Sequence, residues 1–341
     1  LVQHLLVLAV ASALLLPNVG MALYDPWETH YAEVARRIWM HGDWITLRWH
    51  ADHRLAEDVN SRCRGNPEVC TFFSKPALIF WLMGFTYGAF GLDEEESTRR
   101  MLADRSSVPS VLQRNDASVR LPFVLIGIFG VFAAYFYIRK MVGLRAGLLA
   151  AAVLITTPYY YLLSRQVMTD IAFVVPMTVG LLSLTYWLAY PDEARPRHLY
   201  LFYALAGIAT LAKGLLGFLL PGAIIFCFFL LRPLEFFNRI KRARLLRGLA
   251  VFLSVAAPWY IAVWLINGDT WYREFIVKHH LRRVREGVLG ERGTFEYFVE
   301  QLGYGLWPWL ALLPLAFGAA WWTSSRGRRE GERDMRAMLL L

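Results

Sequence analysis

Charged residues and cysteines are scarce in this sequence. Only 18% of its 341 residues are Asp, Glu, Lys or Arg, whereas 57% are hydrophobic and 15% are aromatic. This balance disfavours a soluble globular domain and is typical of a membrane protein with several spans. No segment resembles a P-loop or a module that binds RNA or DNA. We therefore expect no nucleic-acid partner, despite the net charge of +9.

Eight apolar runs approach the length that crosses a bilayer, which predicts an all-α, polytopic transmembrane bundle. We interpret the first run as a retained helix, because no cleavage site of the usual small-residue kind follows it. The run at 77–90 is short, which indicates a re-entrant or interfacial helix instead of a span. The eight runs are 5–22, 121–138, 146–163, 171–190, 198–212, 215–231, 249–266 and 306–322.

The distribution of positive charge predicts the orientation of the bundle. If 77–90 does not cross, four basic segments share one side, which the positive-inside rule places in the cytoplasm. These segments are 139–145, 195–197, 232–247 and 326–336. The extracytoplasmic side then carries a first loop at 23–120, a turn at 165–170, a later loop at 267–304 and the turn at Lys213. The sequence does not begin with Met and ends in an apolar stretch at 337–341, so we expect a transmembrane module over 1–341 that is truncated at its C-terminus.

The three cysteines have two different predicted roles. Cys63 and Cys70 lie in the first outward loop, an oxidising compartment, where they form either a disulfide or two free thiols. A metal site at this pair is disfavoured, because no other Cys or His nearby has finger-like spacing. Cys227 lies inside a predicted span, and we interpret it as a packing residue.

The segment 25–42 follows the first apolar run directly and is the most informative stretch of the chain. Apolar residues recur every three or four positions between Tyr31 and Trp39. This periodicity predicts an amphipathic helix over 28–40, suited to the membrane interface and ended by Gly42.

The polar residues at the start of this helix allow two interpretations. Asp25 is a good N-cap, Pro26 occupies the favoured first position, and Glu28 falls where a capping-box acid belongs. Capping leaves His30 beside Glu33 unexplained. Because charged groups at a membrane lip are costly unless they are paired, solvated or functional, the alternative is a reaction centre.

Further charged residues lie on the same predicted side. Lys75 either snorkels to the surface or binds a ligand. Asp170 either caps the helix that begins at 171 or belongs to the site. Lys213 interrupts two apolar runs without an acidic neighbour in sequence, which indicates an anionic partner in space. The basic cluster in 271–292 lies where topology disfavours positive charge, and it is either a solvated face or a site for phosphate oxygens.

Acids near two membrane lips and cations able to hold phosphate indicate group transfer from a lipid phosphate. A carboxylate can act as general base on an acceptor hydroxyl, while Lys, Arg or a metal stabilises the departing phosphate. Such a transfer of sugar requires no ATP.

The chain resembles the GT-C membrane glycosyltransferases, in the broad family of protein O-mannosyltransferases and bacterial aminoarabinose transferases that modify lipid A. The likeness covers nearly the whole chain and rests on the order and spacing of its motifs. These motifs are Glu28-Thr-His-Tyr-Ala-Glu33-Val-Ala-Arg36 with Gly42-Asp43-Trp44, Lys75-Pro76 before Phe80-Trp81-Leu82, Arg120-Leu-Pro122, Arg165 with Thr169-Asp170, Lys213-Gly214, Pro258-Trp259-Tyr260, and Gly293-Thr-Phe295 before Pro308-Trp309.

The resemblance implies an integral-membrane glycosyltransferase that transfers a sugar with inversion. The implied partners are a polyprenyl-phosphate sugar donor, membrane lipids and an extracytoplasmic acceptor, with the active site on the periplasmic face of a bacterial inner membrane. The resemblance assigns catalysis to Asp25, Glu28 and Asp170, with either Asp25 or Glu28 as the base. It assigns binding of the donor phosphate to Lys75, Lys213, Arg282 and Arg283. It also assigns substrate contacts to His30, Tyr31 and Arg165, and metal binding to His279 or His280.

Two positions depart from the pattern of the family. Trp27 stands where the first-loop motif has an acid, and Ser74 replaces a Glu that is associated with metal binding in some members. Whether a divalent metal ion takes part therefore stays open. A catalytically inactive relative is one alternative, and a transporter of lipids or oligosaccharides is another. Transporters place charges in a midplane cavity between repeated helices, whereas here the charges gather at one face, which favours an enzyme.

Overall fold

The protein is a bundle of helices, as predicted. The computed structural model describes residues 1–23, 25–48, 71–91, 94–104, 108–190, 194–231, 240–282 and 294–324. In these ranges every regular element is a helix, and one isolated bridge joins Arg48 to Thr71. The elements are α1 (Val2–Leu15), α2 (Pro26–His41), α4 (Leu78–Phe90), α5 (Glu94–Ala103), α6 (Val108–Met141), α7 (Leu144–Thr156), α8 (Pro158–Leu163), α9 (Thr169–Ala189), α10 (Arg197–Lys213), α11 (Leu216–Leu231), α13 (Leu245–Trp271), the π-helix η4 (Tyr272–Arg282), α15 (Phe295–Leu306), the 3-10 helix η5 (Trp309–Leu312) and α16 (Leu313–Ser324).

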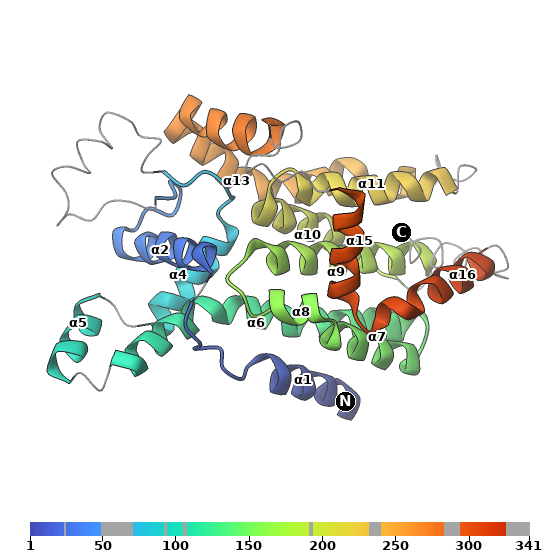
Figure 1. The fold of residues 1–341 in the computed structure, drawn as a ribbon. Coiled ribbons are helices and arrows are strands. Elements are labelled where there is room, and N and C mark those ends of the chain that lie inside the picture. Colours follow the sequence, from blue (N-terminus) through green and yellow to red (C-terminus); the bar gives the residue numbers. More distant parts are fainter. Residues whose placement is uncertain are drawn as a thin grey trace.

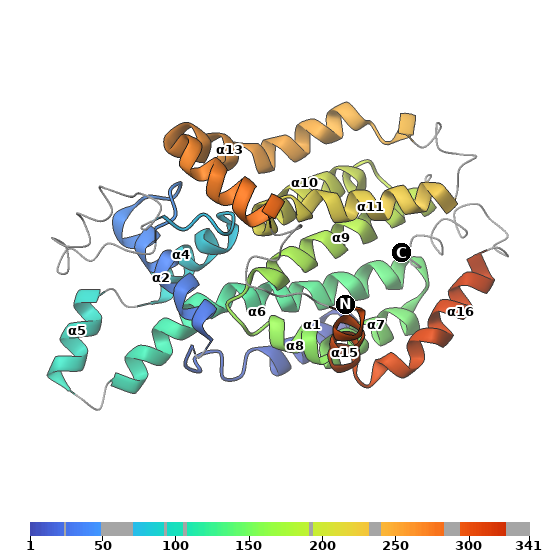
Figure 2. The same ribbon diagram turned by 45° about the horizontal axis from the view of Figure 1, so that its top comes forward.

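The core of the bundle consists of helices that run side by side. α6 contacts α9, α9 contacts α10, and α10 contacts α11 and α13. Helices α2, α4 and α5 gather at one end of this bundle, which we call the α2 end (Figure 1). A view turned by 45° shows the same arrangement, with α13 running toward that end and η4 folding back from it toward α10 and α11 (Figure 2).

Several helices have the length and composition of membrane spans. Among the described residues, Val111–Met141, Thr169–Ala189 and Leu245–Arg282 are long and apolar enough to cross, and Phe295–Leu306 with Trp309–Ala319 makes a fourth if the pair, bent by 106°, is one span. This number is below the eight predicted apolar runs, because several of those runs form shorter helices. Together these helices make the chain a multi-pass membrane protein.

Prolines break two of the predicted runs. The first run ends early, at Leu15, because Pro17 cannot donate a backbone N–H to a continuing helix. The run at 146–163 is split into α7 and α8, where Pro158 takes the first position of the new helix.

Two helices at the α2 end match their predictions closely. Asp25 caps α2 by accepting a 2.8 Å hydrogen bond from Trp27 N, and Gly42 ends it in the left-handed region with φ 70°. The apolar face of α2 packs on α4, with the Tyr31 and Phe80 rings edge to face at 5.6 Å. α4 is 13 residues long, as expected of a helix too short to span.

One packing prediction is wrong. Cys227 lies on α11 as a free thiol, and its side chain is exposed on the surface of the bundle instead of packing in the core. Periodicity could not decide this, because α11 is apolar on all sides.

Candidate active site

A buried ion pair joins α2 to α6 at the α2 end. Glu28 is fully buried, and its Oε1 lies 3.4 Å from Nη2 of Arg120, whose side chain is 4% exposed. The same Oε1 accepts a 2.9 Å hydrogen bond from the backbone N–H of Val167. The carboxylate therefore binds one cation and one backbone donor, and it connects α2 with α6 and with the turn before α9.

Arg120 also holds the linker between α1 and α2. Its Nη1 donates to the carbonyl oxygens of Val19, at 2.8 Å, and of Met21, and its Nη2 lies 3.4 Å from the oxygen of Ala22. These carbonyls follow the end of α1 and lack helical partners, so the guanidinium replaces the missing backbone donors. We call Glu28, Arg120 and the Val167 N–H the buried clamp.

The buried clamp changes how the first-loop acids are interpreted. Glu28 is inaccessible in this structure, so its carboxylate holds the fold and cannot reach an acceptor hydroxyl. Asp25, three residues earlier, is half-buried, and its Oδ1 caps α2. Of the two candidate bases, Asp25 is the one that a substrate can approach.

The neighbouring candidates on α2, Tyr31 and His30, differ in how deeply they are buried. Tyr31 is 4% exposed and packs edge to face against Phe72 and Phe80, so its ring belongs to the core. His30 is half-buried and meets the exposed ring of Trp27 at 5.9 Å between centroids. Trp27 thus forms a surface beside Asp25, in the place of the family's acid.

Glu33 lies at the centre of a local charge cluster on α2. Its carboxylate accepts hydrogen bonds from Arg36 Nε at 2.8 Å and from Arg37 Nε at 2.7 Å. Burial by itself would raise the pKa of Glu33, but the hydrogen bonds and charges of Arg36 and Arg37 outweigh it and lower that pKa. His30 has no part in these bonds, so Glu33 serves its own helix.

A second ion pair joins α9 to α10. Lys213 Nζ lies 2.5 Å from Asp170 Oδ1, and both side chains are partly exposed, at 27% and 35%. The predicted anionic partner of Lys213 is therefore confirmed as Asp170. The capping alternative for Asp170 is wrong, because α9 begins at Thr169 with Met168 as its N-cap. We call this pair the open pair.

The open pair lies close to the buried clamp along the chain. Val167, which donates to Glu28, is three residues from Asp170, a backbone distance of at most about 10 Å. Asp25 is likewise three residues from Glu28. The two accessible carboxylates, Asp25 and Asp170, therefore each lie three residues along the chain from a member of the buried clamp.

The π-helix η4 supports the turn that carries Lys213. Leu215 N donates to His280 Nε2 at 3.4 Å, while His280 Nδ1 lies 2.6 Å from the carbonyl oxygen of Phe275. Gly214 has φ +71°, and a Cβ at this position would lie 2.5 Å from His280 Nε2. His280 therefore packs directly against the turn, with both ring nitrogens engaged by backbone groups.

Other predicted site residues lie around this centre or elsewhere. Lys75 is half-buried immediately before α4, and Arg282 is exposed at the end of η4. Arg165 donates to Tyr161 Oη and to the Pro17 carbonyl oxygen, both at 2.5 Å, so it braces the linker after α1. Arg283, Cys63 and Cys70 lie outside the described residues.

A further set of contacts, which sequence reasoning did not anticipate, holds 43–48 between α4 and α13. Trp81 Nε1 donates to the Trp44 carbonyl oxygen at 2.6 Å, and Trp259 Nε1 to that of Ile45 at 3.2 Å. Asn267 Nδ2 donates to Thr46 Oγ1 at 3.0 Å. The first and the later predicted outward loops therefore meet at the α2 end.

Comparisons with known proteins identify similar sequences and a similar fold. A family model described as dolichyl-phosphate-mannose-protein mannosyltransferase matches residues 107–263. A similar protein is an undecaprenyl phosphate-alpha-4-amino-4-deoxy-L-arabinose arabinosyl transferase of Pectobacterium atrosepticum, 27% identical over 93% of this chain and 49% of its own length. The crystal structure of ArnT from Cupriavidus metallidurans bound to undecaprenyl phosphate aligns with a TM-score of 0.74 and 23% identity, over 98% of this chain and 53% of that one. The chain therefore shares its fold with this ArnT structure and is similar in sequence to these transferases.

The chain spans about half the length of the curated relatives it matches. An uncharacterized protein of Aquifex aeolicus, for example, is 22% identical over 96% of this chain and 56% of its own length. The matched half contains the buried clamp, the open pair and η4.

In the described part of the chain, the predicted ligands His279 and His280 do not form a three-ligand metal site. In that part of the chain, no three His, Cys, Asp or Glu side chains lie close enough together to hold a metal ion. His279 Nε2 lies 3.9 Å from Glu274 Oε2, whereas both nitrogens of His280 bind backbone groups. Ser74 replaces the acid that a metal would need there. No step of the chemistry proposed below therefore involves a metal.

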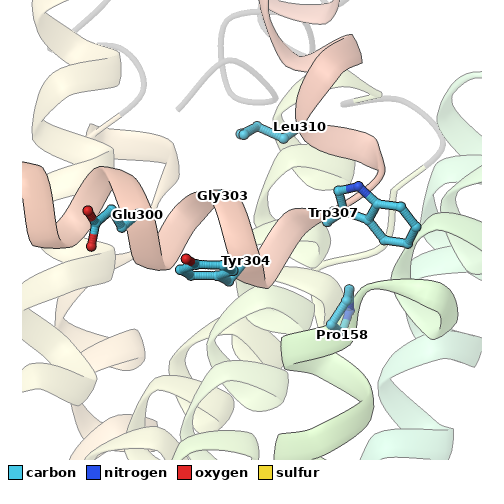
Figure 3. Close-up of a pocket in the computed structure, with 6 residues that line it drawn as sticks. All are labelled: Pro158, Glu300, Gly303, Tyr304, Trp307 and Leu310. Atoms are coloured by element: carbon cyan, nitrogen blue, oxygen red, sulfur yellow. The ribbon is translucent and has the colours of Figure 1, made fainter.

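A pocket of about 600 Å³ lies elsewhere in the bundle, between α15, η5 and α8. Figure 3 shows Tyr304 and Glu300 on α15, with Pro158 of α8 below them. Trp309 Nε1 donates to Thr156 Oγ1 at 2.9 Å and anchors this region to α7. The lining residues are Pro158, Glu300, Gly303, Tyr304, Trp307 and Leu310. None of them is a predicted site residue, so the pocket is separate from the candidate active site.

Proposed function

We propose that this chain carries the catalytic centre of a glycosyltransferase that moves a sugar from a polyprenyl-phosphate donor to an extracytoplasmic acceptor with inversion. The observation that carries the proposal is the open pair, which provides an accessible carboxylate and an accessible ammonium. Similarity of residues 107–263 to a mannosyltransferase family model supports the reaction class, and the undecaprenyl phosphate in the names of the relatives supports a lipid-phosphate donor. The periplasmic face follows from the side to which the positive-inside rule assigns the α2 end.

The proposed reaction is a single displacement. Asp25 accepts the proton of the acceptor hydroxyl, and the acceptor oxygen forms a bond to the anomeric carbon of the sugar. The bond between that carbon and the phosphate oxygen breaks, and its electron pair stays on the departing polyprenyl phosphate. Attack from the side opposite the leaving group inverts the anomeric carbon.

The cations at the α2 end have the complementary role. Lys213 neutralises the charge that develops on the phosphate, and Lys75 and Arg282 are positioned at neighbouring segments to add to it. Asp170 accepts a hydrogen bond from the acceptor, which orients its hydroxyl toward Asp25. Glu28 and Arg120 touch no substrate in this scheme and keep α2 and the 164–170 turn in place.

The test is transfer in proteoliposomes that contain the purified protein. Undecaprenyl phosphate-linked 4-amino-4-deoxy-L-arabinose, the donor in the names of the relatives, is compared with undecaprenyl phosphate-linked mannose. Lipid and protein acceptor fractions are supplied on the outer face, and mass spectrometry detects the released undecaprenyl phosphate and the glycosylated product. We expect one donor to support transfer, and Asp25→Asn to lower kcat by about 10²- to 10⁴-fold, the usual contribution of a general base.

The control for this test is Glu96→Gln on α5, which removes the carboxylate that pairs with Arg99 and Arg100 on its own helix and is not a predicted site residue. Asn caps helices about as well as Asp, so Asp25→Asn should keep its melting temperature. If Asp25→Asn and Asp170→Asn both transfer sugar at the rate of the Glu96→Gln control, the assignment of the centre is wrong.

A further inference from the structure

The two charges of the open pair are each stabilised by the end of their own helix. Asp170 lies in the first turn of α9, where the helix dipole favours a negative group. Lys213 is the last residue of α10, where the dipole favours a positive group. Both side chains also reach solvent. Separation of the pair therefore leaves neither charge buried without compensation.

The surroundings allow the Lys213 side chain to move while its backbone stays in place. The backbone of the turn is held by a hydrogen bond from the Leu215 N–H to His280 and by the positive φ of Gly214. The ammonium itself lies 5.5 Å from the centroid of the Phe173 ring, which attracts a cation without fixing its direction. Its four-carbon chain can thus turn from Asp170 to another anion without any change in the fold.

A lipid phosphate competes well with a carboxylate for this ammonium. The phosphate of the donor is a diester with one negative charge, as a carboxylate has, and the product polyprenyl phosphate is a monoester with about −1.5 to −2 at pH 7. Lys–carboxylate pairs at exposed positions are weak, so little free energy is needed to separate Lys213 from Asp170. The released carboxylate then offers both oxygens to a hydroxyl donor.

We propose that the open pair is a latch that the donor phosphate opens. In the absence of donor, Lys213 occupies Asp170 and the acceptor site is incomplete. The phosphate of the donor takes Lys213, and Asp170 becomes available to accept a hydrogen bond from the acceptor hydroxyl. Donor therefore binds before acceptor, and the product polyprenyl phosphate keeps the latch open until it leaves. This inference rests on the proposed function and adds an order of binding to it.

Direct binding of undecaprenyl phosphate to the purified protein tests the latch without requiring turnover. Native mass spectrometry in detergent gives the affinity for the wild type, Asp170→Asn, Lys213→Gln and the double variant. We expect Asp170→Asn to bind about three- to fivefold more tightly, the range that an exposed ion pair supports. In the Lys213→Gln background the same change should have no effect, because no latch remains to be opened.

The matched control is again Glu96→Gln, whose surface pair with Arg100 should leave the affinity unchanged. Inorganic phosphate and phosphatidate are added as competitors, and we expect both to displace undecaprenyl phosphate poorly. Equal competition by either one would contradict a latch that responds to the donor lipid.

Each other outcome also decides the question. Unchanged or weaker binding by Asp170→Asn overturns the latch but leaves the proposed function standing. Equal tightening in the Lys213→Gln background shows general repulsion between Asp170 and phosphate, which also overturns it. If the wild type binds no undecaprenyl phosphate, the proposed function is wrong and the latch with it.

Discussion

The two ion pairs at the α2 end differ in almost every physical respect. Glu28 and Arg120 are buried, lie 3.4 Å apart and share hydrogen bonds with backbone groups of two other segments. Lys213 and Asp170 lie 2.5 Å apart, but both are partly exposed and join only two helix ends. A buried pair is costly to break because each charge is left without water, whereas an exposed pair exchanges partners easily. We therefore interpret the buried pair as a stabiliser of the fold and the exposed pair as part of the reaction centre.

The largest expected effect comes from breaking the buried clamp. Arg120→Ala leaves Glu28 buried without a cation and three linker carbonyls without their donor, so we expect a loss of about 3–5 kcal/mol of stability. Thermal unfolding in detergent micelles measures this loss as a much lower melting temperature than that of Asp170→Asn. The double variant Glu28→Gln/Arg120→Met should regain part of the loss, because it removes the unpaired charge. If Arg120→Ala melts like Asp170→Asn, the clamp does not hold this end together.

An intermediate effect is expected at the turn that supports the open pair. Gly214→Ala forces a side chain into a backbone region used almost only by glycine, and its Cβ would lie 2.5 Å from His280 Nε2. We expect a cost of about 1–3 kcal/mol and a raised KM for the donor, since Lys213 is displaced. Gly222→Ala on α11 is the matched control, because nothing lies within 4 Å of its Cβ position. An unchanged donor KM in a folded Gly214→Ala protein would argue against the supporting role of this turn.

The smallest expected effect concerns Glu33, which pairs with Arg36 and Arg37 on its own helix. Its carboxylate is less buried than the buried clamp. Its folded pKa is lower than the usual value of 4.5, so its contribution to stability is present above that value and is lost as the pH falls through the folded pKa. Melting temperature measured from pH 6 down to pH 3 should therefore fall less steeply for Glu33→Gln than for the wild type. Parallel profiles would show that Arg36 and Arg37 contribute nothing through Glu33.

Much of the candidate site could be predicted from the sequence because the signals were local. The N-cap at Asp25, the left-handed Gly42 and the short α4 follow from residues within one or two helical turns. The isolated charge of Lys213 correctly predicted an anionic partner. The position of Arg120 also predicts a partner for its charge. Arg120 stands at the start of an apolar run, where a charge is costly unless it is paired.

What the sequence by itself determined is the class of the protein: an all-α membrane bundle of GT-C type, with its acids and cations at one end. Hydropathy, capping and charge bias are properties of short segments, so they can be recognised without coordinates. Only the tertiary structure decided which acid is accessible. Glu28 meets Arg120 from 92 positions away and Val167 from 139, while Asp170 meets Lys213 from 43. Burial and pairing depend on how distant helices pack, and that packing made Glu28 part of the framework and left Asp25 and Asp170 open to a substrate.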